Sequence, residues 1–89
     1  MNAICAYQLF VNDSVQKVEM PLRATTVRVA MQSGVLCFWA LVPTTNVSLC
    51  TRRFRIRRDG DEFDARDERY VGSATDGYGD VWHVLEVTR

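Results

Sequence analysis

The sequence of 89 residues has little lysine, one histidine, two prolines and no net charge. Ten of its eleven basic residues are arginine, and eleven acidic residues balance them. A coat for long nucleic acid or a polybasic membrane binder needs a net positive face, so this balance argues against both. The chain also lacks an apolar run of the roughly 18 residues that span a membrane, and its start lacks the pattern of a signal peptide. We therefore expect a cytosolic protein that binds neither a membrane nor long nucleic acid.

Three cysteines, Cys5, Cys37 and Cys50, form an odd set with no close pair. A small secreted chain usually carries an even set of disulfides. Structural zinc sites usually contain a short C-x2-4-C pair, which is missing here even if His83 is counted as a fourth ligand. The acidic stretch after Arg58 likewise lacks the order of a calcium-binding loop. We expect buried free thiols and no metal or other cofactor.

The composition, 47% apolar and 25% charged, indicates one globular domain over residues 1–89. Its periodicity is that of β-strands almost throughout. We expect about seven short strands at 4–11, 15–20, 26–32, 35–42, 51–58, 69–74 and 81–87, with at most one short helical turn near 64–69. The predicted fold is mainly β, a small antiparallel sandwich or barrel.

Several details of this fold are predicted as well. Turn residues at 12–14 predict that the first two strands form a hairpin, and Ser33-Gly34 predicts another. Residues 35–42 are the most apolar segment, which favours a central strand covered on both faces. In residues 26–32, alternation places three apolar residues on one face, namely Val27, Val29 and Met31. The aromatic residues expected to form much of the core are Phe10, Phe38, Trp39, Phe54, Phe63 and Trp82.

The zero net charge conceals a strongly ordered charge distribution. Residues 1–51 carry +1, residues 52–58 carry +5 and residues 59–89 carry −6. Alternation along a strand places Arg53, Arg55 and Arg57 on one face, roughly 6.6–6.8 Å apart. Three guanidiniums at this spacing repel one another unless a negative group lies between them. That group is either the protein's own acids at 59–68 or a phosphorylated ligand, whose oxygens match the arginine fork.

Three further residues are candidates for the same ligand site. Tyr70 and Tyr78 lie near glycine-rich turns, and an aromatic ring beside arginines suits a nucleobase that carries phosphate. Ordinary core packing is the alternative, and we favour it for Trp82. His83 is able to act as a general base, but no nucleophile or paired carboxylate is identifiable beside it. A structural or ligand-binding role is therefore favoured, and the sequence contains no catalytic motif.

The chain resembles a family of small uncharacterised phage-encoded proteins over about residues 18–86. The matching segments are Val18-Glu19-Met20-Pro21, Gly34, Cys37-Phe38-Trp39-Ala40-Leu41-Val42, Arg53-Phe54-Arg55-Ile56, Gly60, Phe63, Tyr70-Val71-Gly72 and Trp82-His83-Val84-Leu85-Glu86. Family members commonly have Gly-Thr-Gly-His where this chain has Arg58-Asp59-Gly60-Asp61, of which only Gly60 is retained. The resemblance implies a viral accessory protein that acts in the cytoplasm of an infected bacterial host, and it implies no enzymatic activity.

Joined to the arginine strand, the resemblance leads to a specific hypothesis. The protein would be a homo-oligomeric binder that sequesters a small phosphorylated nucleotide, an immune signal of the host, through Arg53, Arg55, Arg57, Tyr70, Tyr78 and His83. The step from family to activity is an analogy, because fold alone does not establish function. One alternative is a module that inhibits a host protein by direct contact. Another is a small hydrolase that uses His83.

Overall fold

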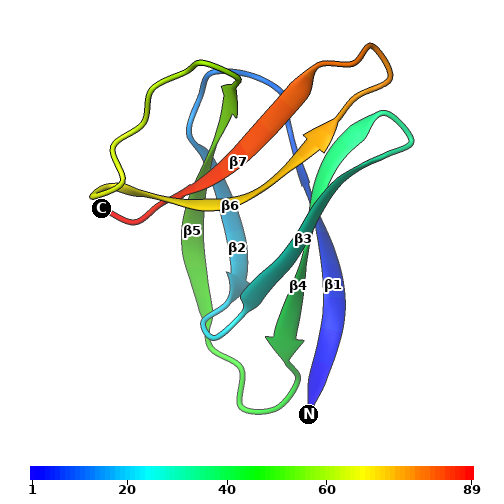
Figure 1. Cartoon of the computed structure of the whole chain (residues 1–89). Helices are drawn as coiled ribbons and strands as arrows, with labels where there is room; N and C mark the ends of the chain where they lie inside the picture. The colour runs from blue at the N-terminus through cyan, green and yellow to red at the C-terminus, as the bar shows by residue number, and fades with distance from the viewer.

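The computed structural model describes residues 1–89 and contains seven strands and no helix (Figure 1). The strands are β1 (Asn2–Leu9), β2 (Gln16–Pro21), β3 (Thr25–Gln32), β4 (Val35–Pro43), β5 (Leu49–Arg58), β6 (Glu68–Thr75) and β7 (Val81–Val87). They form a three-stranded sheet, β1-β4-β3, and a four-stranded sheet, β2-β5-β7-β6, in which all neighbours are antiparallel. The prediction of a small antiparallel β-sandwich is confirmed.

Only one turn of helical character lies in the segment where a short turn was expected. The backbone N–H groups of Asp67 and Glu68 both donate to the carbonyl oxygen of Asp64, at 2.9 and 3.0 Å. The chain then enters β6, so the turn does not extend into a helix. None of the protein's segments is a helix with the length and apolar character needed to cross a membrane.

The hairpin predicted for the first two strands is wrong. β1 pairs with β4 in one sheet, and β2 pairs with β5 in the other, so residues 10–15 cross between the sheets. Each strand has one apolar face, and separate sheets allow Leu9 and Met20 to be buried in one shared core. The Gln16 side chain fixes the crossing by bonding both the N–H and the carbonyl of Phe10. The second predicted hairpin is confirmed, with positive φ angles at Ser33 and Gly34.

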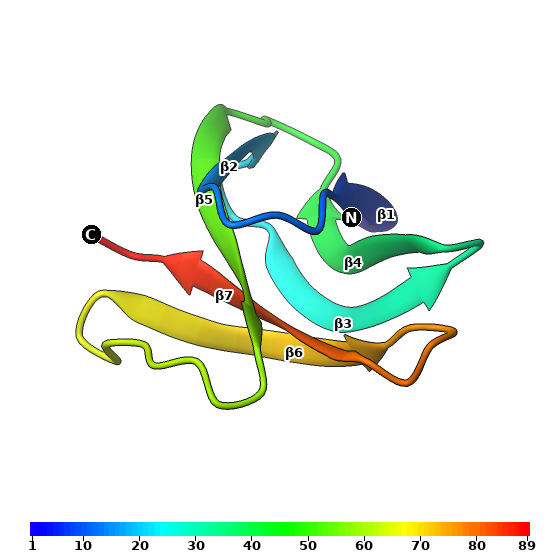
Figure 2. The same ribbon diagram turned by 90° about the horizontal axis from the view of Figure 1, so that it is seen from above.

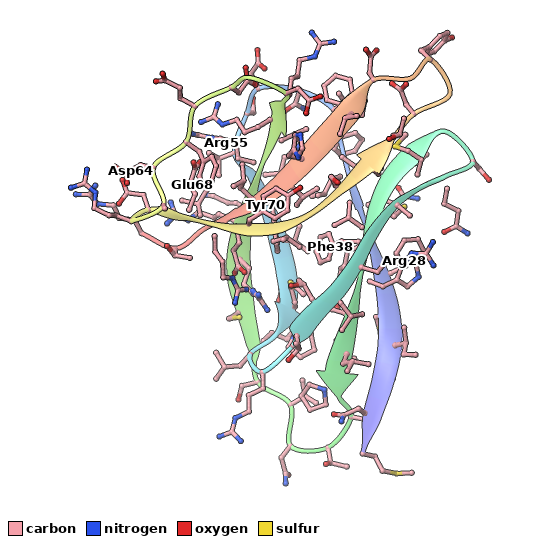
Figure 3. All side chains as sticks on the ribbon, in the orientation of Figure 1. Arg28, Phe38, Arg55, Asp64, Glu68 and Tyr70 are labelled. Atoms are coloured by element: carbon pink, nitrogen blue, oxygen red, sulfur yellow. The ribbon has the colours of Figure 1, made fainter.

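Phe38 of β4 lies in the middle of the core, between the two sheets (Figure 3). Its ring stacks on Tyr7 of β1 with centroids 5.2 Å apart and meets Phe54 of β5 at 4.7 Å. The prediction that Phe10 and Phe63 belong to the core is wrong, since Phe10 is 71% exposed and Phe63 is 46% exposed. Phe10 directly follows β1, and Phe63 lies in the middle of the loop between β5 and β6, so neither belongs to a strand that faces the core. Trp39 and Trp82 are half-buried.

β4 is the central strand of its sheet, as predicted, but its outer face is not fully covered. Leu41 on that face is 38% exposed and its register partner Ile4 is 71% exposed. Val27 is also exposed, because a β-bulge between Thr26 and Arg28 takes it out of the alternation.

All three cysteines are free. Cys37 is buried, whereas Cys5 and Cys50 are half-buried, so complete burial was predicted correctly for one thiol of the three.

Candidate functional site

Arg53, Arg55 and Arg57 project from the outer face of the four-stranded sheet, as strand alternation predicts. The residues between them, Phe54 and Ile56, are buried in the core. On the outer face the three arginines lie opposite Val87, Leu85 and His83 of β7, respectively. We call Arg53, Arg55 and Arg57 the arginine face.

Residues of the segment that joins β5 to β6 line a hollow over the arginine face. Figure 2 shows this segment as the long loop that leads from the end of β5 to the start of β6. The hollow measures about 740 Å³, within the range of roughly 300–1,000 Å³ that is typical of small-molecule sites. Its lining residues are Arg53, Arg55, Arg57, Glu62, Phe63, Asp64, Ala65, Arg66, Asp67, Glu68, Val87 and Arg89. The C-terminal end of the chain closes one side, where the N–H of Thr88 donates to the carbonyl of Asp67 at 2.8 Å.

One carboxylate, that of Glu68 at the start of β6, lies against the arginine face (Figure 3). Its Oε1 is 3.3 Å from Nη1 of Arg55 and 3.7 Å from Nη2 of Arg57. Glu68 is only 6% exposed, whereas both arginine side chains are more than a quarter exposed. The Nε atoms of Arg55 and Arg57 are buried without a hydrogen-bond partner, and Arg53 forms no ion pair. Glu68 therefore compensates this face only in part.

The other acids around the hollow are mostly engaged elsewhere. Asp64 receives two side-chain hydrogen bonds from Arg66, which lower the pKa of Asp64 below its usual value. Asp67 pairs with Arg89 at 3.2 Å. Glu62 forms no ion pair with the arginine face. The acidic segment 59–68 thus places one carboxylate, rather than several, against three arginines.

His83 lies beside Arg57 and joins two residues through its ring nitrogens. Nδ1 is 2.8 Å from the hydroxyl of Tyr70, and Nε2 is 2.5 Å from Oδ1 of Asp59. Since a carboxylate only accepts, Nε2–H donates to Asp59 and Nδ1 accepts the proton of Tyr70 in the neutral ring. A smaller hollow of about 150 Å³ lies beside these three hydrogen-bonded side chains. Its lining residues are Arg57, Asp59, Gly60, Asp61, Phe63, Tyr70, His83 and Leu85.

The tertiary structure thus brings five of the six predicted site residues to one sheet face, namely Arg53, Arg55, Arg57, Tyr70 and His83. Tyr78 is separate from them: it is 94% exposed in the β6–β7 turn and lines a different hollow, with Met31 and Trp82. Trp82 packs against the core and donates from Nε1 to Asp76 at 3.0 Å, which lowers the pKa of Asp76.

Sequence reasoning missed Glu68 and Asp59 as members of the site. A signal for Glu68 existed, because it lies two residues before Tyr70 and so shares a strand face with it. Asp59 lies in a loop, where no periodicity indicates the direction of a side chain. Arg52 lies on the opposite face of β5, as strand alternation predicts, and it pairs there with Glu86.

The side chains of the site differ in what they offer to a ligand. Both ring nitrogens of His83 have partners within the protein, the Tyr70 hydroxyl and the Asp59 carboxylate. No group of three or more His, Cys, Asp or Glu side chains has the arrangement needed to hold a metal ion. The chemical capacity of the site lies in its guanidiniums, which suit the oxygens of phosphate or carboxylate groups.

Comparison with known proteins adds a family assignment. No curated protein matches the chain, and no solved structure does. One family profile, described as "Domain of unknown function (DUF7352)", matches residues 1–89. Because the match extends over the whole chain, the protein belongs to this domain-of-unknown-function family.

Proposed function

We propose that the protein binds and sequesters a small phosphorylated nucleotide, with phosphate held by Arg53, Arg55 and Arg57. The observation that carries this proposal is the excess of positive charge on the arginine face, where three guanidiniums have one carboxylate among them, that of Glu68, which reaches only Arg55 and Arg57. Two buried Nε–H groups there have no acceptor. A buried donor without a partner costs about 1–3 kcal/mol, and phosphate oxygens would relieve that cost.

The size and charge of the hollow favour a small ligand over a polymer. Its volume of about 740 Å³ suits a mononucleotide or dinucleotide. Acids also lie at its edge, including Asp64 and Asp67, and these would repel the backbone of a long nucleic acid as it continued past the site.

The biological part of the proposal is that the protein acts for a phage in the cytoplasm of an infected bacterium. Its support is the resemblance to phage-encoded proteins, combined with a site built for binding. Sequestering a host immune signal needs one binding site per bound molecule and no catalysis. Assembly into a homo-oligomer, which we also propose, would bury the apolar outer face of β1 and β4.

A module that inhibits a host protein by direct contact is the second candidate. It is favoured by the exposed side chains of Ile4 and Leu41, which lie opposite each other on the three-stranded sheet. Exposed apolar patches of this kind mark protein contacts in other proteins. A host protein that co-purifies with the chain, and still does so after R53A/R55A/R57A, would favour this candidate.

The test of nucleotide binding is thermal shift with a panel of cyclic dinucleotides, mononucleotides and ADP-ribose derivatives. A ligand at 100 times its dissociation constant adds about 2.7 kcal/mol to the free energy of unfolding. We expect this shift for at least one member of the panel, and its loss in R53A. The R53A variant retains the fold because Arg53 has no ion-pair partner in the protein.

Two further variants make this test specific. R55K/R57K keeps both charges but loses the planar fork, so it should bind more weakly than the wild type. Arg28 lies away from the site, above the Trp39 ring at 6.0 Å, so R28A serves as a matched control and should bind normally. Absence of a shift with every compound would overturn the proposed function.

A further inference from the structure

We infer that the smaller hollow beside His83 holds the base of the bound nucleotide, and that this base is guanine. The inference rests on the proposed function, since it requires phosphate on the arginine face. We call the smaller hollow the base slot, lined by Arg57, Asp59, Gly60, Asp61, Phe63, Tyr70, His83 and Leu85.

The two hollows adjoin each other. Arg57 and Phe63 line both, so a ligand that fills both passes beside them. The base slot measures about 150 Å³, a volume similar to that of the engineered cavity that takes up benzene. It therefore suits the six-membered ring of a purine, and the fused five-membered ring would lie outside it, toward the larger hollow. Phe63 and Tyr70, each about half-exposed, supply aromatic surface at this slot for contact with a heterocycle.

The polar groups of the slot determine which ring fits. Asp59 accepts from His83 through Oδ1, and its Oδ2 has no partner in the protein. Asp61 accepts the backbone N–H of Arg58 through Oδ2 at 2.8 Å, and its Oδ1 has no partner. Gly60 lies between them at a φ of +88°, and the N–H of Asp61 closes this turn by donating to the carbonyl of Arg58 at 3.1 Å. The slot thus offers two free carboxylate oxygens, and these oxygens only accept hydrogen bonds.

Guanine is the base that matches two acceptors. Its Watson–Crick edge carries the N1–H and N2–H₂ donors side by side, and the free oxygens of Asp59 and Asp61 would accept one donor each. Adenine offers one amino donor next to the acceptor N1, which a carboxylate repels. A guanine nucleotide carries negative charge at its phosphate end and hydrogen-bond donors at its base end. The site has the complementary order, with arginines where the phosphate would lie and Asp59 and Asp61 where the donors would lie. The carboxylates therefore select for guanine and against adenine.

The experiment compares 5′-GMP, 5′-IMP and 5′-AMP by following backbone amide shifts of the ¹⁵N-labelled protein, which detects weak binding. The three share the ribose and phosphate, and IMP lacks only the N2 amino group. We expect GMP to bind roughly tenfold more tightly than AMP, with IMP between them, because a two-point contact to a base discriminates by about that amount or more. The largest shifts should occur in residues 57–63 and at His83.

Two variants test the assigned groups. In D59N and D61N the carboxamide replaces a charged acceptor, and the preference for GMP over AMP should fall below about twofold while AMP affinity changes little. Asp13 lies exposed in the crossing loop, away from the slot, so D13N is the matched control and should keep the preference. The amide spectrum of each variant also reports whether it has folded.

Inorganic pyrophosphate separates the inference from the proposed function. Equal affinity for GMP and AMP, or a preference that persists in both D59N and D61N, would overturn the guanine assignment and leave the proposed function standing. Pyrophosphate binding at the arginine face without binding of any of the three nucleotides would overturn the guanine assignment as well. If pyrophosphate and all three nucleotides fail to bind, both conclusions fall.

Discussion

Arg52 and Glu86 form a two-point ion pair at the inner side of the four-stranded sheet, with Nε and Nη2 of Arg52 each donating to a different carboxylate oxygen at 2.6 Å. The remaining nitrogen, Nη1, donates to the carbonyl of Ala24 at 2.6 Å. Glu86 also accepts from Arg69 at 2.6 Å. Arg52 is thus satisfied within the protein, whereas the next residue, Arg53, has no ion-pair partner.

The Arg52–Glu86 pair makes stability depend on pH. Burial raises the pKa of Glu86, but hydrogen bonds from Arg52 and Arg69 outweigh it and hold that pKa below the ordinary value of 4.5. A carboxyl whose pKa is lower in the folded state contributes stability above its unfolded pKa, and this contribution is lost as pH falls through the folded pKa. We expect the free energy of unfolding of the wild type to decrease as the pH drops below about 4.5.

The variant E86Q isolates this effect. At neutral pH it should lose about 3 kcal/mol, since it leaves the Arg52 charge without its counter-ion in a mostly buried position. Urea denaturation at several pH values should show the difference between wild type and E86Q shrinking as the medium becomes acidic. A difference that stays constant down to about pH 3 would contradict this account of Glu86.

Glu68 competes with a bound phosphate for Arg55 and Arg57. The variant E68Q removes this negative charge but keeps the size of the side chain, so one guanidinium hydrogen bond becomes available to a ligand. Such a bond is worth about 1 kcal/mol, which corresponds to about fivefold in affinity for pyrophosphate. Isothermal titration calorimetry of E68Q and wild type checks this. Weaker binding by E68Q would show that Glu68 supports the ligand site rather than competing for it.

Gly72 of β6 lies directly against Val29 of the other sheet. A Cβ placed there would lie 2.8 Å from Cγ2 and 3.2 Å from Cβ of Val29 in β3. We expect G72A to lower the free energy of unfolding by about 1–3 kcal/mol through overpacking. A Cβ on Gly77 meets nothing within 4 Å, so G77A should change stability far less. Thermal unfolding of both variants, and of G72A/V29A, tests the contact, because the smaller side chain that V29A places in β3 should recover part of the loss.

Phe38 stacks on Tyr7 within its own sheet and contacts Phe54 of the other sheet, so its loss should affect the whole fold. We expect F38A to lose about 3–5 kcal/mol, an amount able to unfold a domain of this size. F38L keeps most of the apolar volume and should lose less. F10A alters an exposed side chain and should stay within about 0.5 kcal/mol of the wild type by urea denaturation. Comparable losses in F10A and F38A would contradict the assigned core.

Tyr78 lies outside the candidate site, so its removal should not affect ligand binding. It lines a hollow with Met31 and Trp82, remote from the arginine face. Y78A should therefore bind nucleotide like the wild type, whereas Y70A should bind more weakly because Tyr70 lines the base slot. The amide-shift titration described for GMP measures both. Weaker nucleotide binding by Y78A than by the wild type would show that Tyr78 contacts the ligand.

The sequence by itself determined the strands and, away from the β-bulges, the direction of their side chains. Alternation of polar and apolar residues is a local property, which is why the placement of Arg53, Arg55 and Arg57 opposite Phe54 and Ile56 was predictable. The positive φ angles of Ser33 and Gly34 likewise follow from a turn whose geometry depends on two adjacent residues.

The tertiary structure decided which strands pair and which charges meet. Whether β1 joins β2 or β4 depends on how two apolar faces share one core, and turn residues at 12–14 suit either connection. The pairing of basic with acidic residues also depends on the tertiary structure, although the two segments cancel in the net charge. Glu86 reaches Arg52 across 34 positions, Glu68 reaches Arg55 across 13, and Arg53 is left without an ion pair. Electrostatic compensation depends on distances between strands, and only the folded chain sets those distances.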